Sequence, residues 1–363
     1  MSVASPAATQ KRTKTPVARG TFAFSSPYDV CWLAHYYGLH FTNLFGAKVI
    51  REQDFLLKLK ASKRLPELMI MGNLVVERAA MVSICRELAI NVVHTEDGFF
   101  PHYSTMHADP LGFCWESSLP RLVFRECLGI QRVRARGARE RWLAFHPKAL
   151  PGNVRAPFVF WPLQLIGDQV NLWDLKVKDW TRLIAHFRAC LGEQYQLVIK
   201  EHPRSKENDN TGVRELVQRL PNTVLVPREA DLKSLLSGCC AVAGANSTVL
   251  YEARLMFHKP AYSYARGWFT NHSELFIPVP RREPRPLNRL DWLEENRRLR
   301  TERLDDYTDW FLSHLLARQI PLELAELDPK RLKRAVHRLS YESFVKYGEE
   351  VFLDALEDWP ETA

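Results

Sequence analysis

The chain has 363 residues, of which 46% are hydrophobic, 25% charged and 11% aromatic. This composition is typical of a globular protein and excludes a collagen-like, repetitive or broadly disordered chain. The formal net charge of +8 favours an anionic partner. The sequence has no zinc-finger spacing, no aromatic ribonucleoprotein motif and no helix-turn-helix pattern, so we do not expect that partner to be a nucleic acid.

Residues 1–19 contain no apolar run and are expected to form a flexible tail, without a signal peptide. The longest apolar run, residues 156–167, is interrupted by proline and is shorter than the roughly 20 residues that span a bilayer. We therefore expect a cytoplasmic protein. The seven cysteines lack Cys-x-x-Cys spacing, which argues against a disulfide framework and against a zinc site.

The first half of the chain predicts alternating strands and helices. A short strand is expected at residues 21–24, and the aromatic-rich stretch around Trp32 is expected to be helical. A strand, a helix and a strand then follow at residues 68–71, 74–88 and 91–94. Because this alternation is typical of a parallel sheet, residues 20–152 are predicted to form a Rossmann-like lobe.

The second half repeats the alternation more strongly. Strands are expected at residues 158–161, 195–199, 223–226, 241–243 and 261–264. Helices are expected between them at residues 180–191, 212–220, 231–236 and 247–257. The chain is also long enough for two cores. The predicted fold class is therefore α/β with two Rossmann-like lobes and a cleft between them, the second lobe covering residues 153–280.

The remaining residues, 281–363, have a different character. An Arg-rich, Pro-broken segment leads to helices expected around residues 304–316 and 329–356. Two arrangements are open for these helices: they pack back across the first lobe, or they contact a membrane surface.

Ligands of such sheets bind beyond the carboxyl ends of the strands, so polar clusters at those ends are candidate sites. The first cluster is Glu96-Asp97-Gly98, two carboxylates directly after a predicted strand, for which a turn or helix cap is the structural alternative. The loop that follows is rich in hydrogen-bonding side chains, which suits a polyol acceptor. Its candidate acceptor-binding residues are His102, Tyr103, Trp115 and Ser118.

The second cluster follows the strand that opens the second lobe and ends at Asp168. A carboxylate at this place suits attack on an anomeric carbon, because departure of a phosphate builds positive charge there. The alternative is that Asp168, which follows Gly167, is a turn residue.

The third cluster ends the strand predicted at residues 195–199 and consists of Lys200, Glu201, His202 and Arg204. Lysine and arginine neutralise phosphate or carboxylate groups, and a histidine can donate to a leaving phosphate oxygen. We therefore predict that this cluster binds the anionic group of a donor substrate.

The fourth cluster joins a strand to a helix through a turn of small residues. Asn246, Ser247 and Thr248 offer capping groups at a helix N-terminus, which is suited to a nucleotide phosphate, and Glu252 is placed to accept from ribose hydroxyls. A plain helix cap is the alternative. The sequence contains no Gly-x-Gly-x-x-Gly or Walker loop and no Asp-x-Asp motif beside a strand, so we expect no cofactor and no metal.

Five segments, taken in order, resemble the retaining β-Kdo glycosyltransferases of bacterial capsule and O-antigen synthesis, where Kdo is 3-deoxy-D-manno-oct-2-ulosonic acid. The segments are residues 96–99, 162–168, 200–203, 246–253 and 266–270. The resemblance implies a GT-B-like fold and transfer of Kdo from CMP-Kdo to a saccharide or glycolipid acceptor. It also implies a protein that works at the inner face of the cytoplasmic membrane.

The resemblance further implies roles for particular residues. Asp168 would be the nucleophile of a double displacement, and Glu96 its acid/base partner or the acceptor-side carboxylate, with Asp97 as the less favoured choice. Lys200 and His202 would hold the donor phosphate.

Asn246, Ser247 and Glu252 would hold the CMP.

Two rival functions stay open on the sequence. One is a two-lobed transferase for another nucleotide sugar, such as a UDP-hexose. The other is a non-catalytic scaffold subunit of a polysaccharide assembly complex.

Overall fold

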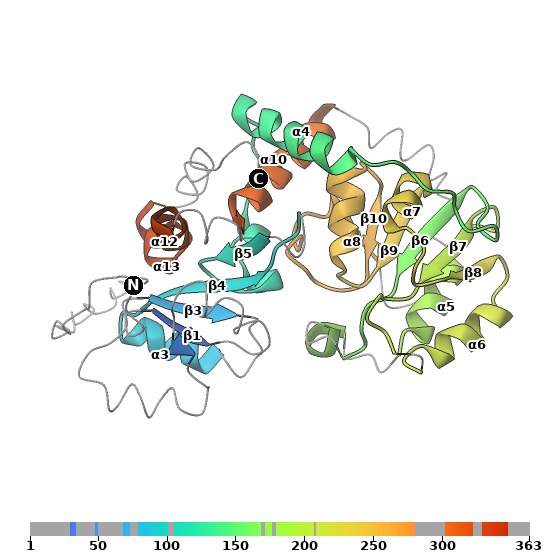
Figure 1. Cartoon of the computed structure of the whole chain (residues 1–363), viewed down its shortest axis with the longest axis horizontal. Coiled ribbons are helices and arrows are strands. Elements are labelled where there is room, and N and C mark those ends of the chain that lie inside the picture. Colours follow the sequence, from blue (N-terminus) through green and yellow to red (C-terminus); the bar gives the residue numbers. More distant parts are fainter. Residues whose placement is uncertain are drawn as a thin grey trace, which may run out of the picture.

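The computed structural model describes residues 30–33, 48–49, 68–72, 79–100, 105–167, 171–175, 179–206, 208–279, 302–321 and 329–347. Within these residues the chain forms two six-stranded sheets that lie side by side, each with helices around it (Figure 1). The fold is α/β, as predicted. We call each sheet with its helices a lobe.

The first sheet is mixed and has the strand order β12-β5-β4-β3-β1-β2. Its parallel strands are β1 (Val30–Leu33), β2 (Lys48–Val49), β3 (Leu68–Gly72) and β4 (Asn91–Asp97). Strand β5 (Thr105–Asp109) runs antiparallel to both of its neighbours, β4 and β12 (Gln319–Pro321). Helix α3 (Ala79–Glu87) connects β3 to β4, which is the strand-helix-strand unit expected from the sequence.

The second sheet is parallel and has the strand order β11-β10-β9-β6-β7-β8. Its strands are β6 (Phe158–Pro162), β7 (Gln196–Lys200), β8 (Thr223–Val226), β9 (Ala241–Gly244), β10 (Ala261–Ser263) and β11 (Phe276–Pro278). The chain builds outward from β6 to β8 on one side and then from β9 to β11 on the other. The order therefore reverses between β6 and β9, as in a doubly wound Rossmann sheet.

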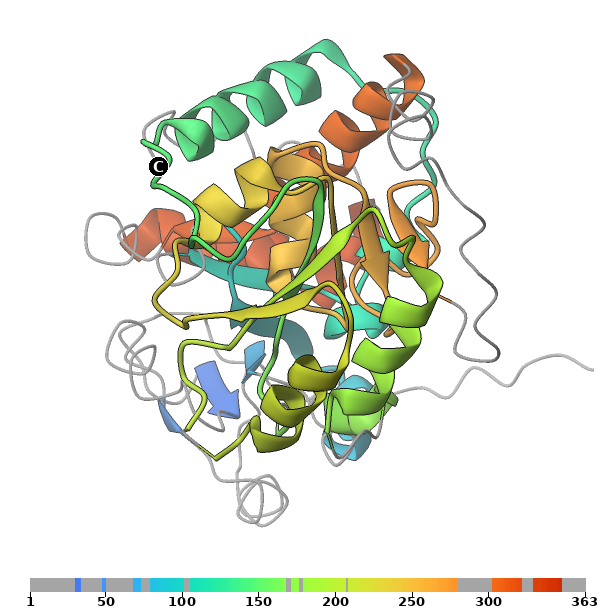
Figure 2. The ribbon, with the colours of Figure 1, turned by 90° about the vertical axis from the view of Figure 1, so that its right-hand side faces the viewer.

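Helices cover both faces of the second sheet (Figures 1 and 2). They are α5 (Thr181–Cys190), α6 (Thr211–Arg219), α7 (Leu232–Gly238) and α8 (Thr248–Tyr251), the last continuing as the π-helix η5 (Glu252–Met256). The side chains of β6 alternate between the faces: Val159 and Trp161 lie in the core with α5 and α6, whereas Phe158 and Phe160 lie in the core with α7 and α8. Burial on both faces explains why this strand is apolar throughout.

The chain's C-terminal part returns to the first lobe. Helix α10 (Glu302–Ala317) packs against α4 (Gly129–Leu143), and β12 then pairs with β5. Helices α12 (Pro329–Arg338) and α13 (Tyr341–Tyr347) follow, and α13 contacts β4. The described helices include none that is long and apolar enough to cross a membrane.

One predicted element was of the wrong type. Trp32 lies in strand β1, paired with β3, and not in a helix. Aromatic residues fit a pleated, half-buried surface well, so a strand is equally compatible with this stretch. The strand expected at residues 21–24 lies outside the described residues.

Candidate functional site

The candidate site begins where the strand order of the second sheet reverses. The carboxyl ends of parallel strands lie at one edge, and the crevice between β6 and β9 is where a doubly wound sheet binds its ligand. Gln164 follows β6 and Asn246 follows β9. The Gln164 Nε2 donates to Asn246 Oδ1 at 2.9 Å, and the Asn246 backbone N–H donates to Gln164 Oε1 at 3.1 Å. Gln164 therefore fixes the orientation of a residue predicted to bind the donor.

The turn after β9 leads into helix α8. Ser247 is the N-cap of this helix, and its hydroxyl accepts from the Val249 backbone N–H at 3.3 Å. This contact is the helix cap that the sequence offered as the plain alternative, and it leaves the hydroxyl proton for another acceptor. Thr248 is half-buried at the first helical position.

Glu252 lies one turn further along, at the junction of α8 and η5, and is buried. Burial raises the pKa of Glu252 to about 7, and the ammonium of Lys233 opposes this shift. A buried carboxyl group whose pKa lies near neutrality, one turn beyond the predicted donor-binding turn, is a candidate functional group.

The loop after β7 carries the basic cluster. Lys200 is the last residue of this strand, and burial lowers the pKa of its ammonium. The Nδ1 of His202 accepts from the Arg204 backbone N–H at 3.1 Å, so the neutral ring carries its proton on Nε2. The Arg204 side chain is exposed.

Glu201 differs from its neighbours in this loop. It is buried, and its Oε1 accepts from Arg214 Nε at 3.1 Å and from Arg214 Nη2 at 2.9 Å. Arg228 Nη2 lies 4.0 Å from the other carboxylate oxygen. Because these two cations already neutralise its carboxylate, we infer that Glu201 fixes the loop.

The first lobe contributes Glu96 and Asp97, which are the last residues of β4 and not part of a loop after it. The next residue, Gly98, has no room for a side chain: a Cβ would collide with Thr105 Oγ1 and lie 2.8 Å from the Thr105 carbonyl carbon. Gln319 Oε1 then accepts from the backbone N–H of Phe100 at 2.8 Å. A residue of the C-terminal strand thus holds the turn behind the two carboxylates.

This turn meets the second lobe through aromatic rings. Phe99 lies with its ring centroid 4.9 Å from that of Tyr251 and 5.7 Å from that of Trp268. His107 is opposite Glu96 in the β4-β5 pair, and its ring centroid lies 4.2 Å from that of Trp268. The carboxyl end of β4 therefore lies beside the α8 side of the second lobe.

The predicted acceptor loop is organised around a buried carboxylate. Asp109 is fully buried and accepts from the backbone N–H of Ser118 at 3.0 Å and from its hydroxyl at 2.7 Å. Arg318 Nε donates to the same hydroxyl at 2.9 Å. Ser118, predicted from the sequence to bind an acceptor, is therefore a core residue whose hydroxyl is used within the fold.

Trp115, on the same loop, is only half-buried. The guanidinium of Arg266 lies over its ring at 4.3 Å from the centroid. Arg266 also donates from Nε to Asp174 Oδ1 at 2.8 Å, and its carbonyl accepts from Asn246 Nδ2 at 3.5 Å. Arg266 thus joins the predicted acceptor-binding residue to the turn after β9, a connection that sequence reasoning did not find.

Three predicted site residues, His102, Tyr103 and Asp168, lie outside the described residues. Their assignments rest on the sequence, as does the expectation that no metal takes part.

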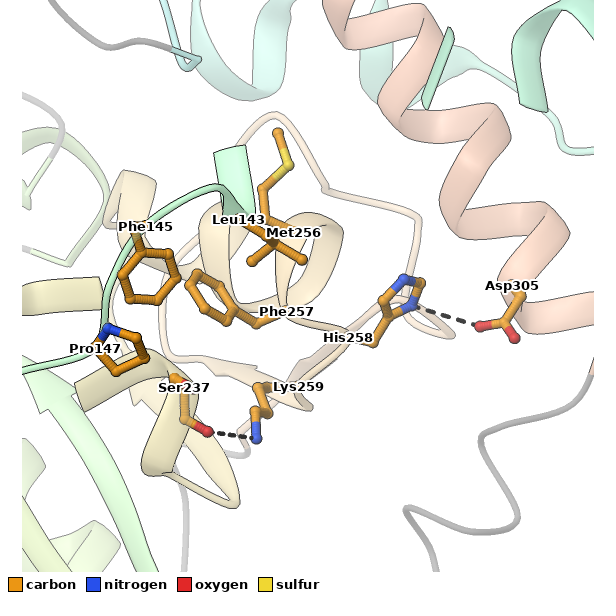
Figure 3. A pocket seen from close by; sticks show the side chains of 9 residues that line it. All are labelled: Leu143, Phe145, Pro147, Ser237, Met256, Phe257, His258, Lys259 and Asp305. Atoms are coloured by element: carbon orange, nitrogen blue, oxygen red, sulfur yellow. Dashed lines mark hydrogen bonds and ion pairs between the residues drawn. The ribbon is translucent and has the colours of Figure 1, made fainter. Parts of the chain in front are cut away.

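A pocket of about 540 Å³ lies at the opposite edge of the second lobe (Figure 3). Its lining consists of Leu143, Phe145, Pro147, Ser237, Met256, Phe257, His258, Lys259 and Asp305. Ser237 and Lys259 shortly precede β9 and β10, so the pocket lies at the amino ends of the strands. Doubly wound sheets bind nucleotides at the carboxyl ends, and we therefore do not assign the donor to this pocket.

No protein-family model matches the chain, and no curated protein matches its sequence. Among solved structures, the β-Kdo 2,7 transferase KpsC of Thermosulfurimonas dismutans is 16% identical; the match covers 84% of this chain and 99% of that one, with a TM-score of 0.51. The KpsC β-Kdo 2,4 transferase is 16% identical, with coverages of 79% and 90% and a TM-score of 0.49. Anabaena HepE in complex with UDP-glucose is 12% identical, with coverages of 84% and 79% and a TM-score of 0.41. The first of these likenesses establishes the fold: the chain has the two-lobed GT-B architecture of glycosyltransferases.

Proposed function

We propose that the chain is a glycosyltransferase that moves Kdo from CMP-Kdo to a saccharide or glycolipid acceptor, with retention of the β configuration. The observation that carries the proposal is the pairing of Gln164 with Asn246 at the strand-order reversal of a GT-B fold. The motifs at the strand ends, which resemble those of retaining β-Kdo transferases, support this choice of donor.

The donor phosphate has suitable partners at this edge. The Asn246-Ser247-Thr248 turn leads into a helix N-terminus, whose dipole favours an anion. The neutral His202 ring carries its proton on Nε2, from which it would donate to a leaving phosphate oxygen, and Lys200 adds a positive charge at the neighbouring strand end. These groups supply the charge stabilisation that a metal ion supplies in other transferases.

The reaction we propose has two steps. In the first, a carboxylate oxygen of Asp168 bonds to the anomeric carbon, the bond from that carbon to the phosphate oxygen breaks, and CMP leaves with the electron pair. In the second, Glu96 takes the proton of an acceptor hydroxyl, whose oxygen displaces Asp168. Two inversions give net retention.

The role of Gln164 provides a test that does not depend on the acceptor. Replacing Gln164 with Leu removes both hydrogen bonds to Asn246, so that its Oδ1 and its backbone N–H lose these partners. Because each of these half-buried hydrogen bonds contributes about 0.5–1.5 kcal/mol to holding Asn246 in place, CMP and CMP-Kdo should bind about tenfold more weakly. Isothermal titration measures both constants.

The matched control is Gln194→Leu, the same substitution at an exposed position of the same lobe. It should leave both binding constants unchanged. Titration with UDP and a UDP-hexose distinguishes the rival donor: binding of these ligands together with no binding of CMP-Kdo would replace Kdo with a hexose in the proposal. Binding of neither class would favour the scaffold function.

A further inference from the structure

Exposed large apolar side chains are concentrated in one stretch of the chain. Of the seven that are exposed among the described residues, five lie between residues 123 and 143: Val123, Leu128, Ile130, Val133 and Leu143. Val123 is 75% exposed and Val133 is 71% exposed. Single exposed apolar residues are ordinary on a soluble protein, whereas a cluster of them marks an interaction site. Leu143 lines the pocket described above, and we call the other four residues the α4 surface.

One face of helix α4 packs against the rest of the protein, and the opposite face is exposed. On the inner face, Ala135 is buried and Arg139 forms an ion pair with Asp309 of α10 at 2.7 Å. Ile130 and Val133, three residues apart and so on one side of the helix, are exposed. Figure 1 shows α4 along the outer edge of the molecule, above α10. The apolar residues are therefore not an extension of the core.

The same stretch is strongly basic. Residues 121–143 contain seven arginines and two glutamates. Arg125 and Arg141 are exposed, and neither forms an ion pair with any residue that the structure describes. Exposed cations beside exposed apolar side chains match the chemistry of an anionic bilayer, with negative headgroups over an apolar interior.

We propose that the α4 surface docks this protein on an anionic lipid bilayer. Ile130 and Val133 enter the boundary between headgroups and acyl chains, and Arg125 and Arg141 contact anionic headgroups. The surface begins eight residues after Trp115, the half-buried residue of the predicted acceptor loop. Docking in this way would hold that loop near the membrane, where a lipid-linked acceptor is presented.

Vesicle flotation of the full chain tests the proposal, with vesicles of phosphatidylcholine and phosphatidylglycerol compared with vesicles of phosphatidylcholine alone. The wild type should float with the anionic vesicles only. The double variant Ile130→Gln/Val133→Gln should lose binding, whereas Val345→Gln, which replaces an equally exposed apolar residue on α13, should retain it. Circular dichroism of each variant verifies that the fold is kept.

The charge contribution has its own test. Arg125→Gln/Arg141→Gln should weaken binding to anionic vesicles about 25-fold, since each arginine near such a surface contributes about fivefold. Equal binding of the wild type and the Ile130→Gln/Val133→Gln variant would overturn the proposal. So would a wild type that ignores vesicles but dimerises through these residues, because the α4 surface would then join two copies of the chain. The vesicles carry no saccharide, so neither outcome depends on transfer activity.

Discussion

A buried histidine in the first lobe makes the stability of the protein sensitive to acid. His94 lies within β4 and is only 3% exposed, and neither of its ring nitrogens has a hydrogen-bond partner in the described part of the chain. Burial, with a smaller contribution from Arg86, lowers the pKa of His94 from 6.5 to about 3. The folded protein therefore holds a neutral ring, whereas the unfolded chain takes up a proton as the pH falls below about 6.5.

The size of the effect follows from this difference. The contribution of His94 to the free energy of unfolding is nearly complete at pH 7 and is lost as the pH falls from about 6.5 towards 3. Because one pKa unit corresponds to 1.36 kcal/mol, the loss between pH 7 and pH 5 is about 2 kcal/mol. Glu252 acts in the opposite direction, since its raised pKa lets the folded state bind a proton in this range.

The comparison that isolates His94 is His94→Leu. Urea denaturation followed by tryptophan fluorescence at pH 7 and pH 5 should show the wild type losing about 2 kcal/mol more than the variant. The contribution of Glu252 is present in both proteins and cancels. His146→Leu, at an exposed position, should follow the wild type. Identical pH dependence of the wild type and His94→Leu would refute the reasoning.

Three further predictions concern the site and its support. Asp109→Ala leaves the fully buried Arg318 without its carboxylate, so the free energy of unfolding should fall by about 3–5 kcal/mol in urea denaturation; a loss below about 1 kcal/mol would contradict the network. Gly98→Ala forces a Cβ against Thr105 and should cost about 1–3 kcal/mol, measured by the same assay; an unchanged midpoint would contradict the close approach. His202→Ala should reduce donor use far more than acceptor affinity in steady-state kinetics, and equal losses on both sides would contradict its assignment to the donor phosphate.

The second lobe was the part most open to prediction from sequence. Its four central strands are buried on both faces, so each is a short apolar run bounded by polar or turn residues, and all five expected strands are present. The short strand β11 was not expected. Only three residues long, it gives too little periodicity to detect.

The first lobe was harder to predict from the sequence, because one edge of its sheet is formed by residues that are distant in the chain. Gln319 is 220 residues away in sequence from the Phe99 amide that it holds. Nothing local in the sequence indicates that β12 returns to pair with β5. The polarity of Ser118 was likewise ambiguous, since a hydroxyl that binds a ligand and one that serves a buried carboxylate look alike until Asp109 and Arg318 are placed beside it.

Only parts of the candidate site could be predicted from the sequence. Lys200, His202 and Asn246 were predicted from their positions after strands, and the structure places those strand ends at one edge. The pairing of Gln164 with Asn246 joins residues 82 apart, and that of Arg266 with Trp115 joins the two lobes. Contacts of this kind require the fold, because spacing along the chain does not encode them.

The central claim is transfer of Kdo through a covalent intermediate, and intact-protein mass spectrometry after incubation with CMP-Kdo, without an acceptor, tests it most directly. The protein should gain the mass of one Kdo residue, and Asp168→Asn should abolish the gain while CMP still binds. An unmodified wild-type protein that also releases no CMP when acceptors are added would contradict it.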